Sequence, residues 1–444
     1  MRILLSFVAF SLLACGESKK DTTQVVDPTA IIPDFKNFED SQGQLTSDGT
    51  RGVFVSQRLD GLYRVFSYDA AAQTKVNQFK SPDFPSASDQ ERLVAMTSDA
   101  AWLAIWRQSP TSSSIRISDW SGQMQATIDL PSDARVSGLA VVGAATPFAA
   151  GLDGFVAVSL RSTNGNVTEV YPISGNGSSI SIAAKVSLTN EFQPNFAQDR
   201  TLYSSESIGS KIKVHARRYI GAAWVDSGQT KVLKSFEVER SYPTQAGLLY
   251  AANLVSNKLR PKSGSQVFSG TDVVTQVGVQ DEVAVFNPYG NTSFSADSTS
   301  YKPYEPLSIS SLSATSDASY VLVGGTDTYF CQNDKVLGAV TLTLVRVSDM
   351  ATIPLLIARN PGETAWSQVI SKPCEALDKG TNLEYDQVIV ASKILGTDGA
   401  KFDLLYETKV SGDREIRFVE FTLDWASGSV QSALFKEISG NQKQ

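Results

Sequence analysis

The chain has 444 residues and a formal net charge of −7 at pH 7. Its hydrophobic content of 42% is enough to build a core, which excludes a chain that is disordered throughout. The acidic balance, with no basic cluster that could neutralise phosphates, argues against a nucleic-acid-binding protein. Gly, Ser and Thr are abundant and long runs of Leu, Ala, Glu and Lys are missing, so the composition favours β structure.

Residues 1–14 have the form of a signal peptide. Met1-Arg2 supplies a minimal charged region, and the apolar stretch that follows is too short to span a bilayer but has the length of a signal-peptide core. This stretch ends in Leu12-Leu13-Ala14-Cys15, which resembles the lipobox of bacterial lipoproteins. The resemblance implies that Cys15 becomes the first residue and carries acyl chains, palmitate among them, that hold the protein on a membrane. An ordinary secretion signal with a chance cysteine is the alternative.

Residues 15–34 are expected to be the lipidated Cys and a flexible tether. They are largely polar, and Asp27-Pro28 and Pro33 act as breakers. Gly16 rather than Asp follows the Cys, which by the lipoprotein sorting pattern resembles an outer-membrane address. We therefore expect a folded domain over 35–444 that is anchored to the bacterial outer membrane, on its periplasmic face or at the cell surface.

A turn followed by an apolar run recurs along the folded domain. Its first copy is Thr46-Ser47-Asp48-Gly49 before Val53-Phe54-Val55. The same Asp-centred turn comes before an apolar run at four further positions: Asp99, Asp199, Asp317 and Asp398. A weaker copy is centred on Asp153. The step from Asp48 to Asp99 is about 50 residues, close to the length of one four-stranded propeller blade.

A second turn follows each good copy and is marked by another Asp: Asp69, Asp119, Asp226, Asp349 and Asp424. It lies about 20 residues after the first turn in the first two copies and further away in the others, so the hairpin between the turns is predicted to be longer there. Asp and Ser side chains bond nearby backbone N–H groups and Gly tolerates positive φ, so the aspartates of both marks are interpreted as structural turn residues. The runs between them are rich in β-formers and predict strands.

This pattern resembles the TolB-like, WD-type β-propeller repeat, in which a Ser-x-Asp-Gly turn precedes an apolar strand. The resemblance implies an all-β fold, a β-propeller of about seven four-stranded blades, with six to eight possible. The pattern fits residues 230–295 poorly, and the proline expected inside the turn is absent from every copy. A pair of β-sandwiches with turn-rich hairpins is the alternative, which the regular spacing disfavours.

Two cysteines remain beyond the lipobox, Cys331 and Cys374. A translocated protein meets an oxidising compartment, so two remaining thiols predict one disulfide between them. Both lie in segments that interrupt the repeat pattern. Two buried free thiols are the alternative.

No catalytic or metal motif is found. Propellers of this repeat type accompany serine peptidases of the prolyl-oligopeptidase kind, but the Gly-x-Ser-x-Gly elbow is missing, and the only histidine, His215, is interpreted as a strand residue between positively charged neighbours. One His and two paired Cys cannot form a zinc site, and no calcium loop is found, so no metal or other cofactor is expected. Trp102 and Trp106, four apart in one strand, are predicted to be core, whereas Trp120 and Trp425 are expected to be more exposed.

The sequence therefore favours a non-enzymatic scaffold, since a tethered propeller presents a rigid disc whose loops and central opening can grip a partner. The expected partner is another envelope protein, a peptide or a glycan, with the membrane bound through the lipid. A propeller-class glycosidase or lyase that uses loop carboxylates is one open alternative, because no spacing identifies such a pair. A surface adhesin is the other.

Overall fold

The protein is all-β in the residues that its computed structural model describes. These are residues 43–57, 62–70, 77–78, 89–143, 148–149, 151–162, 165–175, 180–208, 211–226, 231–234, 238–243, 247–253, 271–278, 294–296, 299–301, 309–332, 335–346, 348, 351–357, 367–370, 387–410, 413–426 and 429–437. Within these ranges every regular element is a strand, and no helix there is long and apolar enough to cross a bilayer. The predicted lipobox with Cys15, the tether and Cys374 lie outside the described residues.

The first two repeats fold into four-stranded antiparallel meanders. The first sheet has the order β1 (Gly43–Leu45), β2 (Arg51–Gln57), β3 (Tyr63–Asp69) and β4 (Asn77–Gln78). The second has the order β5 (Gln90–Met96), β6 (Leu103–Gln108), β7 (Ser113–Ser118) and β8 (Met124–Leu130). In both sheets the strand that enters the predicted turn comes first.

The next three sheets repeat this order. The third is β9 (Arg135–Gly143), β10 (Gly154–Ser162) and β11 (Gly165–Ser174), with β12 (Ser181–Ile182) and β13 (Val186–Thr189) both on the edge of β11. The fourth is β14 (Glu191–Phe196), β15 (Leu202–Ile208) and β16 (Lys211–Ile220), with β17 (Ala223–Asp226) and β18 (Lys231–Lys234) on its edge. The fifth is β19 (Val238–Pro243), β20 (Gly247–Asn253) and β21 (Thr271–Gly278). β22 (Phe294–Ala296) and β23 (Thr299–Tyr301) then form a separate hairpin.

The last two sheets are joined by a bridge between Thr326 and Val388. The sixth is β24 (Ile309–Ala314), β25 (Tyr320–Gln332), β26 (Lys335–Arg346) and β27 (Ala351–Ile357), with β28 (Ser367–Ile370) also on β26. The seventh is β29 (Gln387–Leu395), β30 (Lys401–Val410), β31 (Asp413–Asp424) and β32 (Ser429–Glu437).

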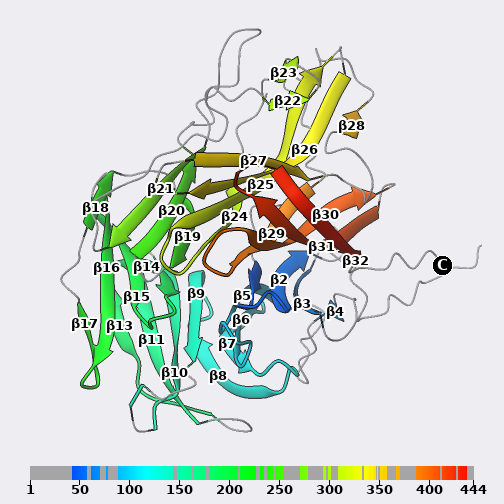
Figure 1. The fold of residues 1–444 in the computed structure, drawn as a ribbon. Helices are drawn as coiled ribbons and strands as arrows, with labels where there is room; N and C mark the ends of the chain where they lie inside the picture. Colours follow the sequence, from blue (N-terminus) through cyan, green and yellow to red (C-terminus); the bar gives the residue numbers. More distant parts are fainter. Residues whose placement is uncertain are drawn as a thin grey trace, which may run out of the picture.

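The first strands of these sheets close a ring. Going round, β1 contacts β5, β5 contacts β9, β9 contacts β14, β14 contacts β19, β19 contacts β24, β24 contacts β29, and β29 returns to β1 (Figure 1). Seven inner strands of the described chain therefore surround one axis, with their meanders running outward. This is the propeller arrangement, and the prediction of an all-β propeller is confirmed.

Apolar side chains fill the space between neighbouring sheets. On β2, Phe54 packs with side chains of the seventh sheet, while Val53 and Val55 pack with the second sheet. The first blade is thus covered on both faces, which is why the Val53-Phe54-Val55 run of β2 is continuously apolar. Where the ring closes between the first and last sheets, Tyr68 stacks on Phe418 with ring centroids 4.9 Å apart.

The predicted lengthening of the middle hairpin is confirmed in the sixth sheet. Strands β25 and β26 have 13 and 12 residues, against 6 and 6 for β6 and β7. The far part of this hairpin extends away from the ring, next to the β22–β23 hairpin (Figure 1). The backbone of Cys331 belongs to β25 and pairs with Val336, so this segment prolongs a strand rather than forming a loop. The predicted disulfide itself lies outside the described residues.

Candidate functional site

The predicted turn aspartates lie between the first and second strands of their sheets. In every good copy, Oδ1 of the Asp accepts a hydrogen bond from the backbone N–H two residues later, at 3.1 Å for Asp48, 3.0 Å for Asp99, 3.1 Å for Asp199, 3.0 Å for Asp317 and 3.0 Å for Asp398. The hydrogen bond from the Thr46 hydroxyl and then that from the Thr50 N–H hold the pKa of Asp48 below its usual value. These carboxylates therefore stabilise their own turns by accepting backbone hydrogen bonds, as predicted for structural turn residues.

Threonine completes the turn in three copies. The hydroxyls of Thr46, Thr97 and Thr315 donate to the turn aspartates at 2.6, 2.7 and 2.7 Å. Each Oγ1 also accepts from the N–H of the residue five positions later, at 3.0, 3.0 and 3.1 Å. The sequence interpretation gave this role to Ser, but the serines between Thr and Asp are left free for another task, since Ser47 and Ser98 line the central cavity described below.

The residue after each turn Asp has a left-handed backbone. The φ angles are 71° at Gly49, 57° at Ala100, 67° at Arg200, 61° at Ala318 and 64° at Gly399. Three copies therefore adopt this conformation without glycine, at a cost in strain that the surrounding hydrogen bonds offset. Gly49 is required for space as well, because a Cβ there would overlap the carboxylate of Asp403. The weak copy differs: Asp153 accepts instead from the N–H of Gly175, at 2.7 Å.

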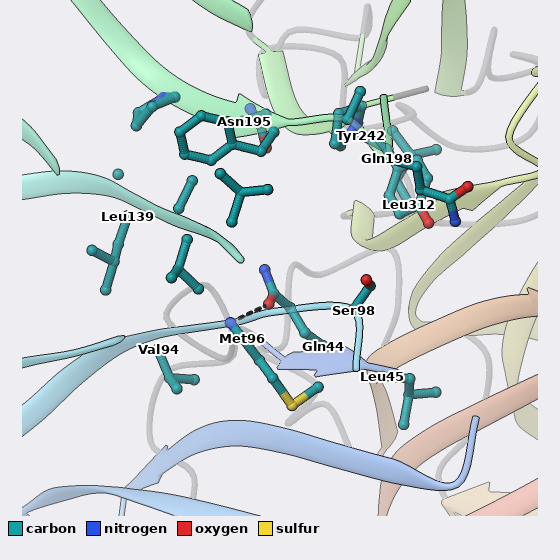
Figure 2. Close-up of a pocket in the computed structure, with 18 of the residues that line it drawn as sticks. Gln44, Leu45, Val94, Met96, Ser98, Leu139, Asn195, Gln198, Tyr242 and Leu312 are labelled. Atoms are coloured by element: carbon teal, nitrogen blue, oxygen red, sulfur yellow. Dashed lines mark hydrogen bonds between the residues drawn. The ribbon is translucent and has the colours of Figure 1, made fainter. Parts of the chain in front are cut away.

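The inner strands enclose a cavity of about 480 Å³, which is within the range of small-ligand sites. Residues from all seven inner strands line it. Gln44 and Ser98 lie on one side, and Asn195, Gln198 and Tyr242 face them from the other (Figure 2). The amide oxygen of Gln44 also accepts from the N–H of Met96, at 2.7 Å, and so links the first two blades.

Hydroxyls and amides dominate the polar part of this lining. They belong to Gln44, Ser47, Ser98, Ser137, Gln193, Asn195, Gln198, Tyr242, Ser311 and Ser392. The charged side chains among the described lining residues are Arg200 and Lys393, both cationic, and the same set contains no Asp, Glu, His or Cys. Such a lining can hydrogen-bond a polar ligand, but it does not supply the two carboxylates that glycoside hydrolysis uses.

One polar pair bridges the cavity wall. Lys393 Nζ donates to the Tyr242 hydroxyl at 2.9 Å and lies 5.6 Å from the centroid of its ring. Lys393 is on β29 and Tyr242 is on β19, and β24 stands between these strands in the ring. The pair therefore spans the inner side of the sixth blade.

His215 is part of a buried ionic network on the fourth sheet. The predicted cationic neighbour is present, since Arg217 Nη2 lies 3.2 Å from Nδ1. Acidic groups contact the ring as well, since Glu206 lies 2.9 Å from Nε2 and Asp226 lies 3.4 Å from Nδ1. These acids come from β15 and β17, which pair with the strand of His215. The nearby Ser204 hydroxyl donates to Glu191, so no Ser-His pair forms.

The tryptophans are placed largely as predicted. Trp102 and Trp106 are buried in one cluster between the second and third sheets, which confirms their assignment to the core. Trp120 and Trp425 are half-buried. The indole N–H of Trp120 donates to Asp69 of the preceding sheet at 3.1 Å, so this residue links blades. No group of three or more His, Cys, Asp or Glu suited to a metal ion occurs in the described part of the chain.

Sequence reasoning missed the cavity. Its polar residues are spread over all seven repeats, from one to four in each, and they form no recognisable motif. A usable signal was present: polar side chains stand four or six positions before the turn Asp in otherwise apolar inner strands, as at Gln44, Gln193, Asn195, Ser311 and Ser392. Because inner strands of a propeller face one axis, aligned polar positions converge there.

No protein-family model and no curated protein matches the sequence. Solved structures that resemble the chain include the WD40 domain of SCAP from fission yeast, at 11% identity and TM-score 0.40, covering 89% of this chain and 87% of that one. The Dos1 propeller has 11% identity and TM-score 0.43, with 85% and 92% covered. A protein from Lactobacillus plantarum has 12% identity and TM-score 0.43, with 86% and 93% covered. Because these identities and scores are low, the propeller assignment rests on the chain's own strand pairing, and the likenesses carry no functional conclusion.

Proposed function

We propose that this chain is a lipid-anchored β-propeller of the bacterial envelope that binds a polar segment of a partner molecule in its central cavity. The observation that carries the proposal is the cavity of about 480 Å³ lined by hydroxyls and amides from the inner strands. These groups both donate and accept hydrogen bonds, and a rigid ring holds them in place before the ligand arrives. Binding rather than catalysis is favoured, because the acid, base and nucleophile candidates of the described lining are limited to Ser hydroxyls and the Lys393–Tyr242 pair, with no carboxylate, His or Cys.

The anchor is proposed from the sequence. Leu12-Leu13-Ala14-Cys15 resembles a lipobox, and the polar residues that follow suit a tether that lifts the propeller off the outer membrane. The Cys15→Ser variant should lose its acyl chains and leave the membrane fraction. Membrane attachment that persists in this variant would contradict the anchor.

Capture of partners from detergent-solubilised envelope tests the binding role. Ser98 is exposed and lines the cavity, so Ser98→Trp should fill part of the space without disturbing the core. Ser132 is exposed in the connection between β8 and β9 and is not part of the lining, so Ser132→Trp is the matched control. The wild type and Ser132→Trp should bring down the same partner, and Ser98→Trp should not, with all three melting at the same temperature. Equal capture by Ser98→Trp would overturn the cavity as the binding site.

A further inference from the structure

The charge of the cavity is opposite to that of the protein. The whole chain carries a formal charge of −7, yet the described lining contains two cationic side chains, Lys393 and Arg200, and no acidic one. A cleft that is lined by charges of one sign attracts the opposite sign, so this cavity favours an anionic group over a neutral or cationic one.

The ammonium group of Lys393 has N–H donors that are not used by the described residues. An ammonium group has three N–H donors, and Lys393 uses one of them in a hydrogen bond to a neutral partner, the Tyr242 hydroxyl. Lys393 makes no ion pair with any described residue, although it is half-buried. Because Tyr242 accepts from Lys393, its own hydroxyl hydrogen remains to donate. The two side chains thus offer several N–H and O–H donors to one point of the cavity, an arrangement that suits a carboxylate.

The rest of the lining suits a peptide better than a sugar. Gln193 and Gln198 carry amide groups, which can pair with peptide N–H and C=O groups in both directions, and Gln44 keeps its amide N–H donors while its oxygen accepts from Met96. A glycan presents many hydroxyl donors, whose strongest acceptors would be carboxylates, and the described lining has none.

We propose that the cavity recognises an acidic peptide segment, whose carboxylate is held by Lys393 and Tyr242. This inference rests on the proposed function of the cavity as a binding site and specifies its ligand. The contact between Lys393 and Tyr242 serves to hold the ammonium group in place between blades five and seven, so that it meets the carboxylate without reorganisation.

Calorimetric titration of the detergent-solubilised full chain tests the assignment. The probes are a capped glycine pentapeptide with one central glutamate and the same peptide with glutamine. The glutamate peptide should bind the wild type about tenfold more tightly, which is the preference expected of one charge-assisted contact. Lys393→Met should abolish the preference, and Lys393→Arg should restore part of it. Lys401 is exposed on β30 outside the lining, so Lys401→Met should keep the full preference.

Each other outcome has a definite meaning. Equal binding of the two peptides by the wild type, or a preference that survives Lys393→Met, overturns the inference. Free acetate or a uronic-acid oligosaccharide binding as tightly as the glutamate peptide overturns the assignment to a peptide. If Ser98→Trp loses the envelope partner while Lys393→Met captures it normally, the inference fails and the proposed function stands; if Ser98→Trp also captures it, the proposed function fails.

Discussion

Two buried glutamates stand at the same place in the repeat and are held in different ways. Glu91 and Glu191 each lie eight residues before a turn Asp, near the start of the inner strands β5 and β14. Their side chains are 1% and 5% exposed. Both carboxylates are therefore buried at this repeat position, and their partners differ.

Glu191 is held inside its own sheet. Its two carboxylate oxygens accept hydrogen bonds from Nη1 and Nη2 of Arg217, both at 2.7 Å. This forked arrangement matches the planar geometry of the guanidinium group. The hydroxyl of Ser204, on the strand between them, also donates to the carboxylate. Among the described residues, Glu191 bonds to the preceding sheet through its backbone carbonyl, which accepts from the Thr168 hydroxyl at 2.9 Å.

Glu91 joins two sheets through its side chain. It accepts from the backbone N–H of Val65, on the preceding sheet, at 2.9 Å, and its contact with Arg107 is longer, at 3.4 Å. Burial raises the pKa of Glu91, and the Val65 N–H, Arg107 and Arg64 oppose this rise. A glutamate at one repeat position can therefore either brace a single blade or connect two, depending on which sheet supplies the hydrogen-bond donor.

The largest effect is expected from breaking the Glu191 fork. Arg217→Met keeps most of the side-chain volume but leaves Glu191 buried with Ser204 as its remaining side-chain donor. Loss of one partner from a buried pair costs about 3–5 kcal/mol, so the free energy of unfolding should fall by that order. Denaturant unfolding of the purified protein measures it.

Arg107→Met is the counterpart at Glu91. It should cost less, about 1–2 kcal/mol, because the lost contact is longer and the Val65 N–H still satisfies the carboxylate. Equal losses for Arg107→Met and Arg217→Met would show that the fork geometry of Glu191 adds nothing, and the comparison would fail.

The next effect is a pH dependence specific to Glu91. Since its pKa is raised in the folded state, its contribution to stability is fully present below the pKa of the unfolded chain and is lost as pH rises through the folded pKa. Glu91→Gln removes this titration. The stability of Glu91→Gln relative to the wild type should therefore increase as pH rises from the ordinary pKa range of Glu, about 4, towards neutrality. Unfolding curves of both proteins across this pH range measure the difference, and a difference that does not change with pH contradicts the assignment.

The sequence predicted the repeat well and the site poorly, and the reason is physical. A turn such as Thr46-Ser47-Asp48-Gly49 is made by residues close in the chain, so its hydrogen bonds can be anticipated from their spacing. Burial of Glu91 and the convergence of Lys393 with Tyr242 depend on which blades are neighbours and on strand register. Those contacts join residues far apart in the chain, and the sequence alone gave no register to place them.

The smallest loss of stability should come from replacing Ser204. This variant distinguishes the contribution of Ser204 from that of the two Arg217 hydrogen bonds to Glu191. The Ser204 hydroxyl donates to Glu191 and accepts from Arg217 Nη1 at 3.2 Å. Ser204→Ala removes one hydrogen bond to a charged group but leaves the Arg217 fork in place, so unfolding should become easier by about 1 kcal/mol. Combined with Arg217→Met, it gives a double-mutant cycle in which the Ser204 contact should matter more once the fork is gone, because it is then the last side-chain donor to a buried carboxylate. If the losses in the free energy of unfolding of the two single variants simply add, Ser204 and Arg217 stabilise Glu191 independently. The three residues would then form two separate contacts and not one coupled network.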